Sequence, residues 1–200
     1  MINRIPIEFI KDYGEGFNRN SKTVNLIFEE LKSITKNYKE ARFRGDLPAP
    51  IRVLDPLDLV LKKPQVFETL KKVKNPEKIL SVVKKHFRSL RASYEYSKIN
   101  LEVKQAFVRK VKTYLLNRPT VLLENDYPYS IFRKNGCGHY VLWGTDSLSI
   151  DMLEGSKRKF GFDYNDIVFY FSNKNENKSV PEVSHIHIIA FNPSSFSLEE

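Results

Sequence analysis

The chain is poor in cysteine and has no long hydrophobic run. Cys137 is the only cysteine among 200 residues, which excludes an intrachain disulfide framework and a zinc site built on paired cysteines. No apolar run approaches the ~20 residues that cross a bilayer, and residues 1–9 lack the continuous apolar core of a secretory signal. We therefore expect no membrane span and a place in the cytoplasm, with the nucleus as the alternative.

The composition is that of a folded domain. Apolar residues make up 41% and aromatic residues 12%, against 28% charged residues, a balance that excludes wholesale disorder and a fibrous protein. The sequence contains no internal repeat and no low-complexity tract. A chain of this length fits one domain.

Positive charge is concentrated in the first part of the chain. Residues 1–120 carry 26 basic and 13 acidic side chains, whereas residues 121–200 carry 7 and 11. The densest stretch, residues 62–118, has 16 bases and 4 acids, and would attract phosphate, nucleic acid or an anionic membrane surface. Lysine dominates this stretch and no nucleic-acid-binding module is present. We therefore expect weak, non-specific nucleic-acid binding at most, and a solvated helical face explains the same composition.

Helices are predicted for the first part of the chain. Ser21 can cap a helix that continues to about Ala41, because apolar residues recur there at three- and four-residue intervals. Another helix is expected over residues 99–116. Between them, proline fits the first turn of shorter helices, which we place after the pairs Asp55-Pro56, Lys63-Pro64 and Asn75-Pro76.

Strands are predicted for the second part of the chain. β-branched and aromatic runs alternate there with turn-forming residues, at residues 120–123, 139–143, 167–171 and 185–191. One more helix is expected within residues 150–159. The fold class is therefore α+β, with N-terminal helices followed by a mainly antiparallel sheet. We predict a single domain in which a basic helical region, residues 1–118, packs on a sheet region, residues 119–200.

Three of the four histidines fall in this sheet region. Alternation along a strand places Cys137 and His139 on one face of their strand, and His185 and His187 on one face of theirs. If the strands pair, the four side chains converge, and one cysteine with three histidines could ligate zinc. A hydrogen-bonded histidine pair explains the spacing without an ion, and we expect no metal.

A polar turn follows the first predicted strand. Asn125 and Asp126 are typical of turns, because their side-chain oxygens bond nearby backbone amides. The functional alternative places both at the mouth of the sheet near His139, with Asp126 as the carboxylate that orients an imidazole. Asn125, Tyr129 and Trp143 are then the candidate ligand-binding residues, although Trp143 is also a typical packing residue. The sequence identifies no cofactor.

Three motifs occur in a recognisable order. They are N-D-Y-P-Y at residues 125–129, G-H-Y-V-L-W at 138–143 and S-V-P-E-V-S-H-I-H-I-I at 179–189. The motifs resemble those of a domain family of unknown function that includes the fungal N-acetylglucosamine-induced proteins, over about residues 119–191. The chain departs from that family at Tyr127, where Phe is usual, and in a longer, more basic link at residues 132–138. The resemblance implies an intracellular protein and supplies no established activity.

A more distant similarity bears on mechanism. Residues 138–143 and 183–189 resemble the G-H-φ-L-V and H-φ-H-φ-H-φ segments of the histidine-triad nucleotide hydrolases and transferases, and imply a histidine-triad-like sheet. In that family the middle histidine attacks phosphorus, so by position His187 would be the nucleophile, assisted by His185 and His139. Ile189 stands in place of the third histidine, and the phosphate contacts of that residue are missing.

Two functions from different classes follow. The first is binding of a phosphorylated small molecule, nucleotide or nucleotide sugar in a histidine-containing cleft, with phosphoester or nucleotidyl chemistry at His187. The alternative is a non-catalytic interaction module whose basic helices bind nucleic acid or an acidic protein partner. Clustered histidines in an open cleft favour the first function, and buried, mutually distant histidines favour the second. Whether the protein is an enzyme is left open at this point.

Overall fold

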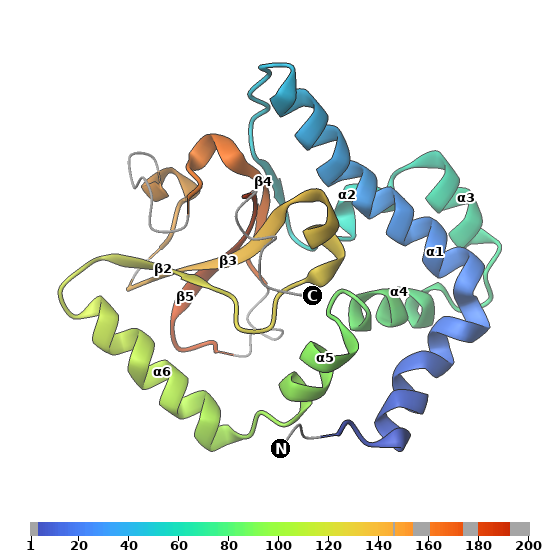
Figure 1. Cartoon of the computed structure of the whole chain (residues 1–200), viewed down its shortest axis with the longest axis horizontal. Helices are drawn as coiled ribbons and strands as arrows, with labels where there is room; N and C mark the ends of the chain where they lie inside the picture. Colours follow the sequence, from blue (N-terminus) through green and yellow to red (C-terminus); the bar gives the residue numbers. More distant parts are fainter. Residues whose placement is uncertain (1–3, 146, 154–160, 174–179, 193–200) are drawn as a thin grey trace.

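The structure is a computed structural model that describes residues 4–145, 147–153, 161–173 and 180–192. Its helices precede most of its strands, which confirms the predicted α+β class (Figure 1). The helices are α1 (Ile7–Phe43), α2 (Asp58–Leu61), α3 (Pro64–Lys71), α4 (Pro76–Lys85), α5 (Leu90–Ser97) and α6 (Leu101–Leu115). The strands are β1 (Ile51–Val53), β2 (Thr120–Glu124), β3 (Cys137–Gly144), β4 (Ile167–Phe171) and β5 (Ser184–Phe191). Three short 3-10 helices are η1 (Ser130–Asn135), η2 (Ile150–Leu153) and η3 (Tyr164–Asp166).

The five strands form one sheet in the order β1-β4-β5-β3-β2. Its pairs β2–β3, β3–β5 and β4–β5 are antiparallel, as predicted, and β1 runs parallel to β4 at the edge. The sheet therefore takes one edge strand from the helical part of the chain. Sequence periodicity does not predict this strand, because it has three residues and its partner lies more than 100 residues away.

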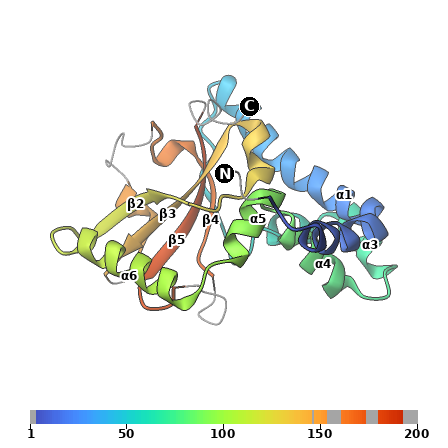
Figure 2. The same ribbon diagram turned by 60° about the horizontal axis from the view of Figure 1, so that its bottom comes forward.

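One face of the sheet is covered by helices in two separate places (Figures 1 and 2). At the β4 side, residues of α1 to α4 and η1 form one core cluster with Phe169, Phe171 and Ile189 of the sheet. At the β2–β3 side, α6 packs through Val111 and Leu115 against a cluster that includes strand residues of β2, β3 and β5. The opposite face is covered by η2, η3 and their neighbours. Space is therefore left on the helix-covered face between α6 and the other helices.

Helix α1 begins earlier than predicted but bends near the predicted start. The expectation of a helix from Ser21 missed the turns from Ile7 onward, yet Asn20 has non-helical angles, φ −120° and ψ 18°. The predicted apolar stripe is buried beyond this bend, at residues that include Val24, Ile27 and Leu31. Ser21 thus marks the beginning of the half of α1 that packs on the core.

The predicted cap with proline in the first turn is complete only at α4; α3 has the proline but no side-chain cap, and α2 begins later than predicted, with Leu57 at its N-cap. Asn75 Oδ1 accepts a hydrogen bond from the Lys78 amide (3.1 Å) at the start of α4, and Asp55 Oδ1 accepts one from the Leu57 amide (2.9 Å) just before α2. Helix α5, capped by Ser89, was not predicted. Within residues 150–159 the structure shows the 3-10 helix η2, and residues 154–160 lie outside the described residues. No described helix has the length and apolar character needed to cross a membrane.

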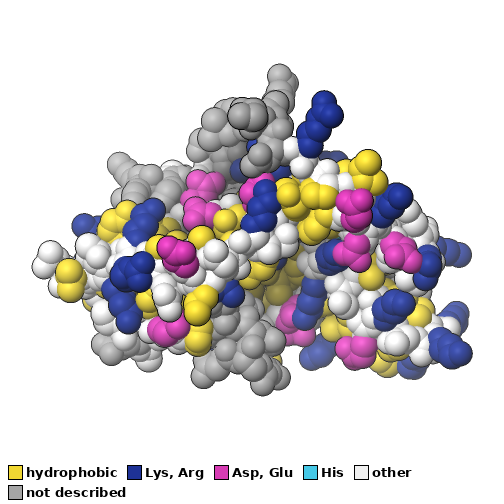
Figure 3. Space-filling model, turned by 90° about the horizontal axis from the view of Figure 1, so that it is seen from below, with side chains coloured by type: hydrophobic (Ala, Val, Ile, Leu, Met, Phe, Trp, Pro, Cys, Tyr) yellow, Lys and Arg dark blue, Asp and Glu magenta, His cyan; other side chains and the backbone are white. Residues whose placement is uncertain are grey.

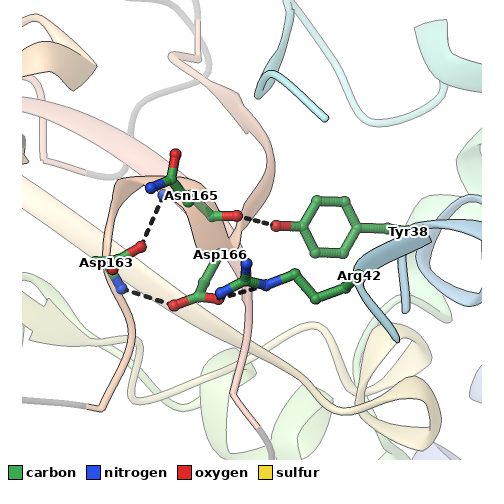
Figure 4. Close-up of polar contacts among 5 residues, drawn as sticks. All are labelled: Tyr38, Arg42, Asp163, Asn165 and Asp166. Carbon is green, nitrogen blue, oxygen red and sulfur yellow. Dashed lines mark hydrogen bonds and ion pairs between the residues drawn. The ribbon is translucent and has the colours of Figure 1, made fainter. Parts of the chain in front are cut away.

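Polar contacts join the end of α1 to the segment before β4 (Figure 4). Arg42 Nη2 and Nε donate to Asp166 Oδ1 at 2.5 and 3.1 Å, and the Tyr38 hydroxyl donates to the Asn165 carbonyl. The Asp166 side chain also caps η3 by accepting from the Asp163 amide (2.9 Å). These contacts fix α1 relative to the strand on which its apolar stripe packs.

Candidate functional site

A cavity of about 420 Å³ lies on the helix-covered face of the sheet. Its floor comes from β3 and β5, and its walls come from α4, α5, α6 and the turn that follows β2. The volume lies within the range of small-molecule sites. Helices α1 to α4 and helix α6 pack at different places on the sheet, and this separation leaves the strand residues between them accessible.

The three sheet histidines lie on the face that forms this floor. In the β3–β5 register Val141 is opposite His187, Trp143 is opposite His185 and His139 is opposite Ile189, and opposite residues share a face. The prediction that His139, His185 and His187 share one face of neighbouring strands is confirmed. Their order along the strands brings His139 next to His187, with His185 on the far side of His187.

His139 and His187 form a hydrogen-bonded pair. His139 Nε2 is 3.0 Å from His187 Nδ1, and on the other side of its ring His139 Nδ1 accepts from the Tyr129 backbone amide (3.2 Å). Asn125 Nδ2 lies 3.2 Å from His139 Nε2. His139 is buried, and its burial, together with the charges of His187 and Arg88, lowers its pKa well below the ordinary value. The pair is therefore uncharged at neutral pH.

His187 is the member of the pair that reaches the cavity. Its side chain is partly exposed and lines the cavity, with its ring stacked on Phe171 at 4.8 Å and an interplanar angle of 9°. Its second nitrogen, Nε2, lies 3.4 Å from Asn173 Nδ2. Desolvation, with smaller contributions from His185 and Arg88, lowers the pKa of His187 to about 3. This histidine offers the cavity a neutral imidazole.

His185 and Trp143 form the apolar end of the cavity. His185 is buried, its Nδ1 is 2.9 Å from the Val183 carbonyl, and its ring lies 4.6 Å from that of Trp143. Phe107 of α6 meets Trp143 edge-on at 5.3 Å. Among buried side-chain nitrogens and oxygens of the described residues, Trp143 Nε1 alone has no hydrogen-bond partner. Trp143 thus both packs in the core and lines the cavity, the two roles that the sequence left as alternatives.

The opposite end is formed by Arg88, between the helices and the turn. Its Nε donates to the Tyr127 carbonyl (2.9 Å), and its guanidinium lies over the rings of Tyr96 (4.4 Å) and Tyr129 (5.0 Å). The Tyr129 ring in turn lies 4.5 Å from the His139 ring, and Arg88 lines the same cavity as His187. A rigidly held cation therefore stands beside the histidines.

Other charges at the cavity are of both signs. Lys84 Nζ pairs with Asp55 Oδ2 at 2.5 Å, which leaves both side chains neutralised locally. Lys104 lines the α6 wall and forms no ion pair with any described residue. Glu124 and Asp126 are exposed residues at the cavity lining. Arg88 and Lys104 are thus the cations of the lining without a carboxylate partner among the described residues, and its exposed carboxylates are Glu124 at the end of β2 and Asp126 of the turn.

The turn residue that contacts His139 is not the expected Asp126. Asp126 lies at the cavity, but within the described structure it makes no hydrogen bond with a histidine; the Tyr129 amide and Asn125 contact His139 instead. Asn125 Oδ1 accepts from the Tyr127 amide (2.8 Å), as expected of an Asx turn. The exposed position of Asp126 follows from this turn, because Asn125 takes the inward position.

Cys137 does not join the histidines. It pairs with Phe191, one step beyond His139 along the same face, and is buried in the α1 cluster, where burial raises the pKa of its thiol to about 12. Among described residues no group of three or more histidine, cysteine or carboxylate side chains is arranged to hold a metal ion. The convergence of Cys137 with three histidines, considered from the sequence, does not occur, because Cys137 and His185 lie at opposite ends of the β3–β5 pair.

Sequence reasoning missed the helical half of the site. Arg88, Tyr96 and Lys104 line the cavity, yet in the sequence they appear only as members of a basic, aromatic helical stretch. A signal was present in the pattern Phe87-Arg88, where a charged residue follows directly on a core position at a helix end. That pattern alone does not predict which part of the chain the Arg88 side chain contacts.

Comparison of the chain with protein-family models, with curated proteins and with solved structures finds no match. The two resemblances drawn from the strand motifs therefore stay predictions.

Proposed function

We propose that the protein binds a phosphorylated small molecule of nucleotide size in this cavity. The observation that carries the proposal is the juxtaposition of Arg88 with the His139–His187 pair at one end and an aromatic, apolar wall at the other. A planar guanidinium is suited to phosphate oxygens, and aromatic rings are suited to a base or another flat group. The two ends match the two halves of a nucleotide.

The polar groups around the histidine pair favour an acceptor-rich ligand. Asn125 presents its amide nitrogen to the pair, because Asn125 Oδ1 is engaged by the turn. Arg88 and Lys104 can only donate hydrogen bonds. A phosphate group, which has only acceptors when ionised, complements these donors better than a cationic or donor-rich ligand does.

The test is calorimetric titration with three probes: adenosine 5′-monophosphate, adenosine and inorganic phosphate. We expect the monophosphate to bind more tightly than either part alone, and at 100 times its dissociation constant to stabilise the fold by ~2.7 kcal/mol. Equal binding of adenosine and its monophosphate would show that the phosphate has no site, and absence of binding by all three would contradict the proposal.

Arg88→Gln and Arg91→Gln form a matched pair for the same titration. Arg88 lines the cavity, whereas Arg91 is an exposed residue of α5 a few positions away. Loss of a charge-assisted hydrogen bond should weaken monophosphate binding about tenfold or more in Arg88→Gln. Arg91→Gln should bind like the wild type. Equal affinities of the two variants would remove Arg88 from the site.

A further inference from the structure

We infer that His139 is a positioning residue that holds His187 as a neutral imidazole with its proton on Nε2, so that His187 meets a ligand as a hydrogen-bond donor and not as a nucleophile. The inference deepens the proposed function and rests on it only for the identity of the acceptor. The tautomer itself follows from contacts within the protein.

The starting point is the Tyr129 backbone amide. A backbone N–H can only donate, and its hydrogen has a direction fixed by the peptide plane. It points at His139 Nδ1, with a nitrogen-to-nitrogen distance of 3.2 Å. His139 Nδ1 must therefore be the unprotonated nitrogen, and a neutral His139 carries its proton on Nε2.

The proton on His139 Nε2 has one acceptor within reach. His187 Nδ1 is 3.0 Å away, the shortest contact of that nitrogen with a described residue. Asn125 Nδ2 is at 3.2 Å and is a donor, since Asn125 Oδ1 already accepts from the Tyr127 amide. The hydrogen bond therefore runs from His139 to His187. His187 Nδ1 is then the unprotonated nitrogen of its ring, and Nε2 carries the proton.

The opposite arrangement places hydrogens against each other. A proton on His139 Nδ1 would meet the Tyr129 N–H head-on, and the peptide plane does not allow that hydrogen to turn away. The conflicts in the assigned arrangement are milder, because they involve only side-chain amides, which can rotate about their own bonds: Asn125 Nδ2 at 3.2 Å from His139 Nε2, and Asn173 Nδ2 at 3.4 Å from His187 Nε2. Both rings are also held in place, His139 against Tyr129 at 4.5 Å and His187 against Phe171 at 4.8 Å.

The chemical consequence concerns the nitrogen that reaches the cavity. A protonated Nε2 has no lone pair in the ring plane, so it cannot attack phosphorus and form a histidyl intermediate. It can donate to an oxygen of a bound ligand, as neutral imidazoles do when they polarise a carbonyl or stabilise a developing negative charge. His139 acts only through His187 and touches no ligand in this scheme.

The test is the tautomer of each histidine, measured from the side-chain nitrogen shifts of ¹⁵N-labelled wild-type protein near pH 7. We expect His139 and His187 both to show a protonated Nε2 and an unprotonated Nδ1. A protonated Nδ1 on His187 would overturn the inference and restore the nucleophilic alternative. This measurement needs no ligand, so its outcome is independent of the proposed function.

Two variants test the positioning role. In His139→Phe, His187 loses the donor to its Nδ1, and its signals should shift toward a mixture of the two tautomers. His86→Phe is the control, because His86 lies outside the site with its Nδ1 at the Val82 carbonyl (2.8 Å). An unchanged His187 tautomer in folded His139→Phe would overturn the role of His139; if this variant does not fold, the wild-type tautomers decide.

Addition of adenosine 5′-monophosphate separates the two proposals. If it binds, the His187 Nε2 proton should move downfield as it is donated to a ligand oxygen. Binding without any change at this proton would overturn His187 as the donor, and absence of binding would overturn the proposed function while leaving the tautomer result intact.

Discussion

His139 and His187 are neutral in the folded protein, so the free energy of unfolding depends on pH. An unfolded histidine titrates near 6.5, whereas burial lowers the pKa of folded His187 to about 3 and also lowers that of His139. Between those values the unfolded chain binds more protons than the folded one. The free energy of unfolding should therefore fall as pH decreases from about 6.5 toward 3, and these groups should add no pH dependence above that window.

Urea unfolding between pH 4.5 and 7.5 measures this effect. Each of the two histidines contributes a slope of up to ~1.4 kcal/mol per pH unit. His187→Gln keeps a polar side chain but does not titrate, so its slope should be smaller than that of the wild type by about one proton. An identical slope in both proteins would mean that His187 titrates normally when folded.

Many of the residues of the site could be predicted from the sequence. The others could not, because their positions depend on contacts between segments far apart in the sequence. Alternation along the strands placed His139 and His187 on one face, and the turn chemistry placed Asn125 beside them. The sequence could not distinguish Asn125 from Asp126 as the inward residue, because that choice depends on which side chain the turn engages. Nor could it bring Arg88 to the cavity of the histidines, since its position depends on how α4 and α5 pack on α1.

At the scale of elements, the contact between α1 and η3 is a local test of how the helices are held on the sheet. Arg42 donates twice to Asp166, whose side chain is only 14% exposed (Figure 4). Arg42→Met keeps the aliphatic stem but leaves this carboxylate without its cation. We expect a loss of ~1–3 kcal/mol in the free energy of unfolding, because a largely buried charge loses its partner.

Arg44→Met is the matched control for this prediction. Arg44 pairs with Asp46, and both side chains are more than half exposed. Exposed pairs contribute little, so the change should stay below ~0.5 kcal/mol. Equal losses from Arg42→Met and Arg44→Met in chemical denaturation would show that the contact of α1 with η3 does not stabilise the fold.

Some helices and strands have local sequence signals that predict them, and others have none. Proline pairs, an asparagine cap and alternating strands placed α3, α4 and strands β2 to β5 close to their observed bounds. Helix α5 was missed because its residues have no strong apolar repeat and none of them is buried. Strand β1 was missed because its three residues become a strand only by pairing with β4.

At the scale of the whole molecule, the positive charge of the helical half is interspersed with negative charge. Figure 3 shows Lys and Arg side chains interspersed with Asp and Glu over the helical half. Several lysines of this half are paired with carboxylates, among them Lys63 with Glu30 (2.5 Å) and Lys85 with Asp12 (2.7 Å). A mixed surface of this kind attracts a polyanion weakly and without sequence preference.

Nucleic-acid binding should accordingly be weak and sensitive to salt. Fluorescence anisotropy with duplex and single-stranded oligonucleotides should show affinity falling between 50 and 200 mM salt, with a log–log slope of roughly −0.7 to −0.9 per neutralised phosphate. Tight binding at 200 mM that discriminates between sequences would favour the interaction-module alternative over a small-molecule site.

The parallel pairing of β1 with β4 makes the two parts of the chain interdependent. A fragment of residues 119–200 would lack β1 and would expose Phe169, Phe171 and Ile189 on the uncovered face. An open edge beside β4 together with exposed apolar surface favours association. We expect this fragment to aggregate or remain unfolded in size-exclusion chromatography and NMR; a monomeric fragment with dispersed amide signals would show that the sheet region folds alone.

The central place of β5 in the sheet also sets the order in which the chain can fold during synthesis. β5 lies between β3 and β4, yet it is the last strand of the described chain to be made. Until Phe191 has left the ribosome, β3 and β4 have no strand to join them, and the apolar stripe of α1 has no completed sheet to cover. Because such unpaired edges and stripes are prone to aggregation, the nascent chain should need protection by chaperones until β5 has been translated.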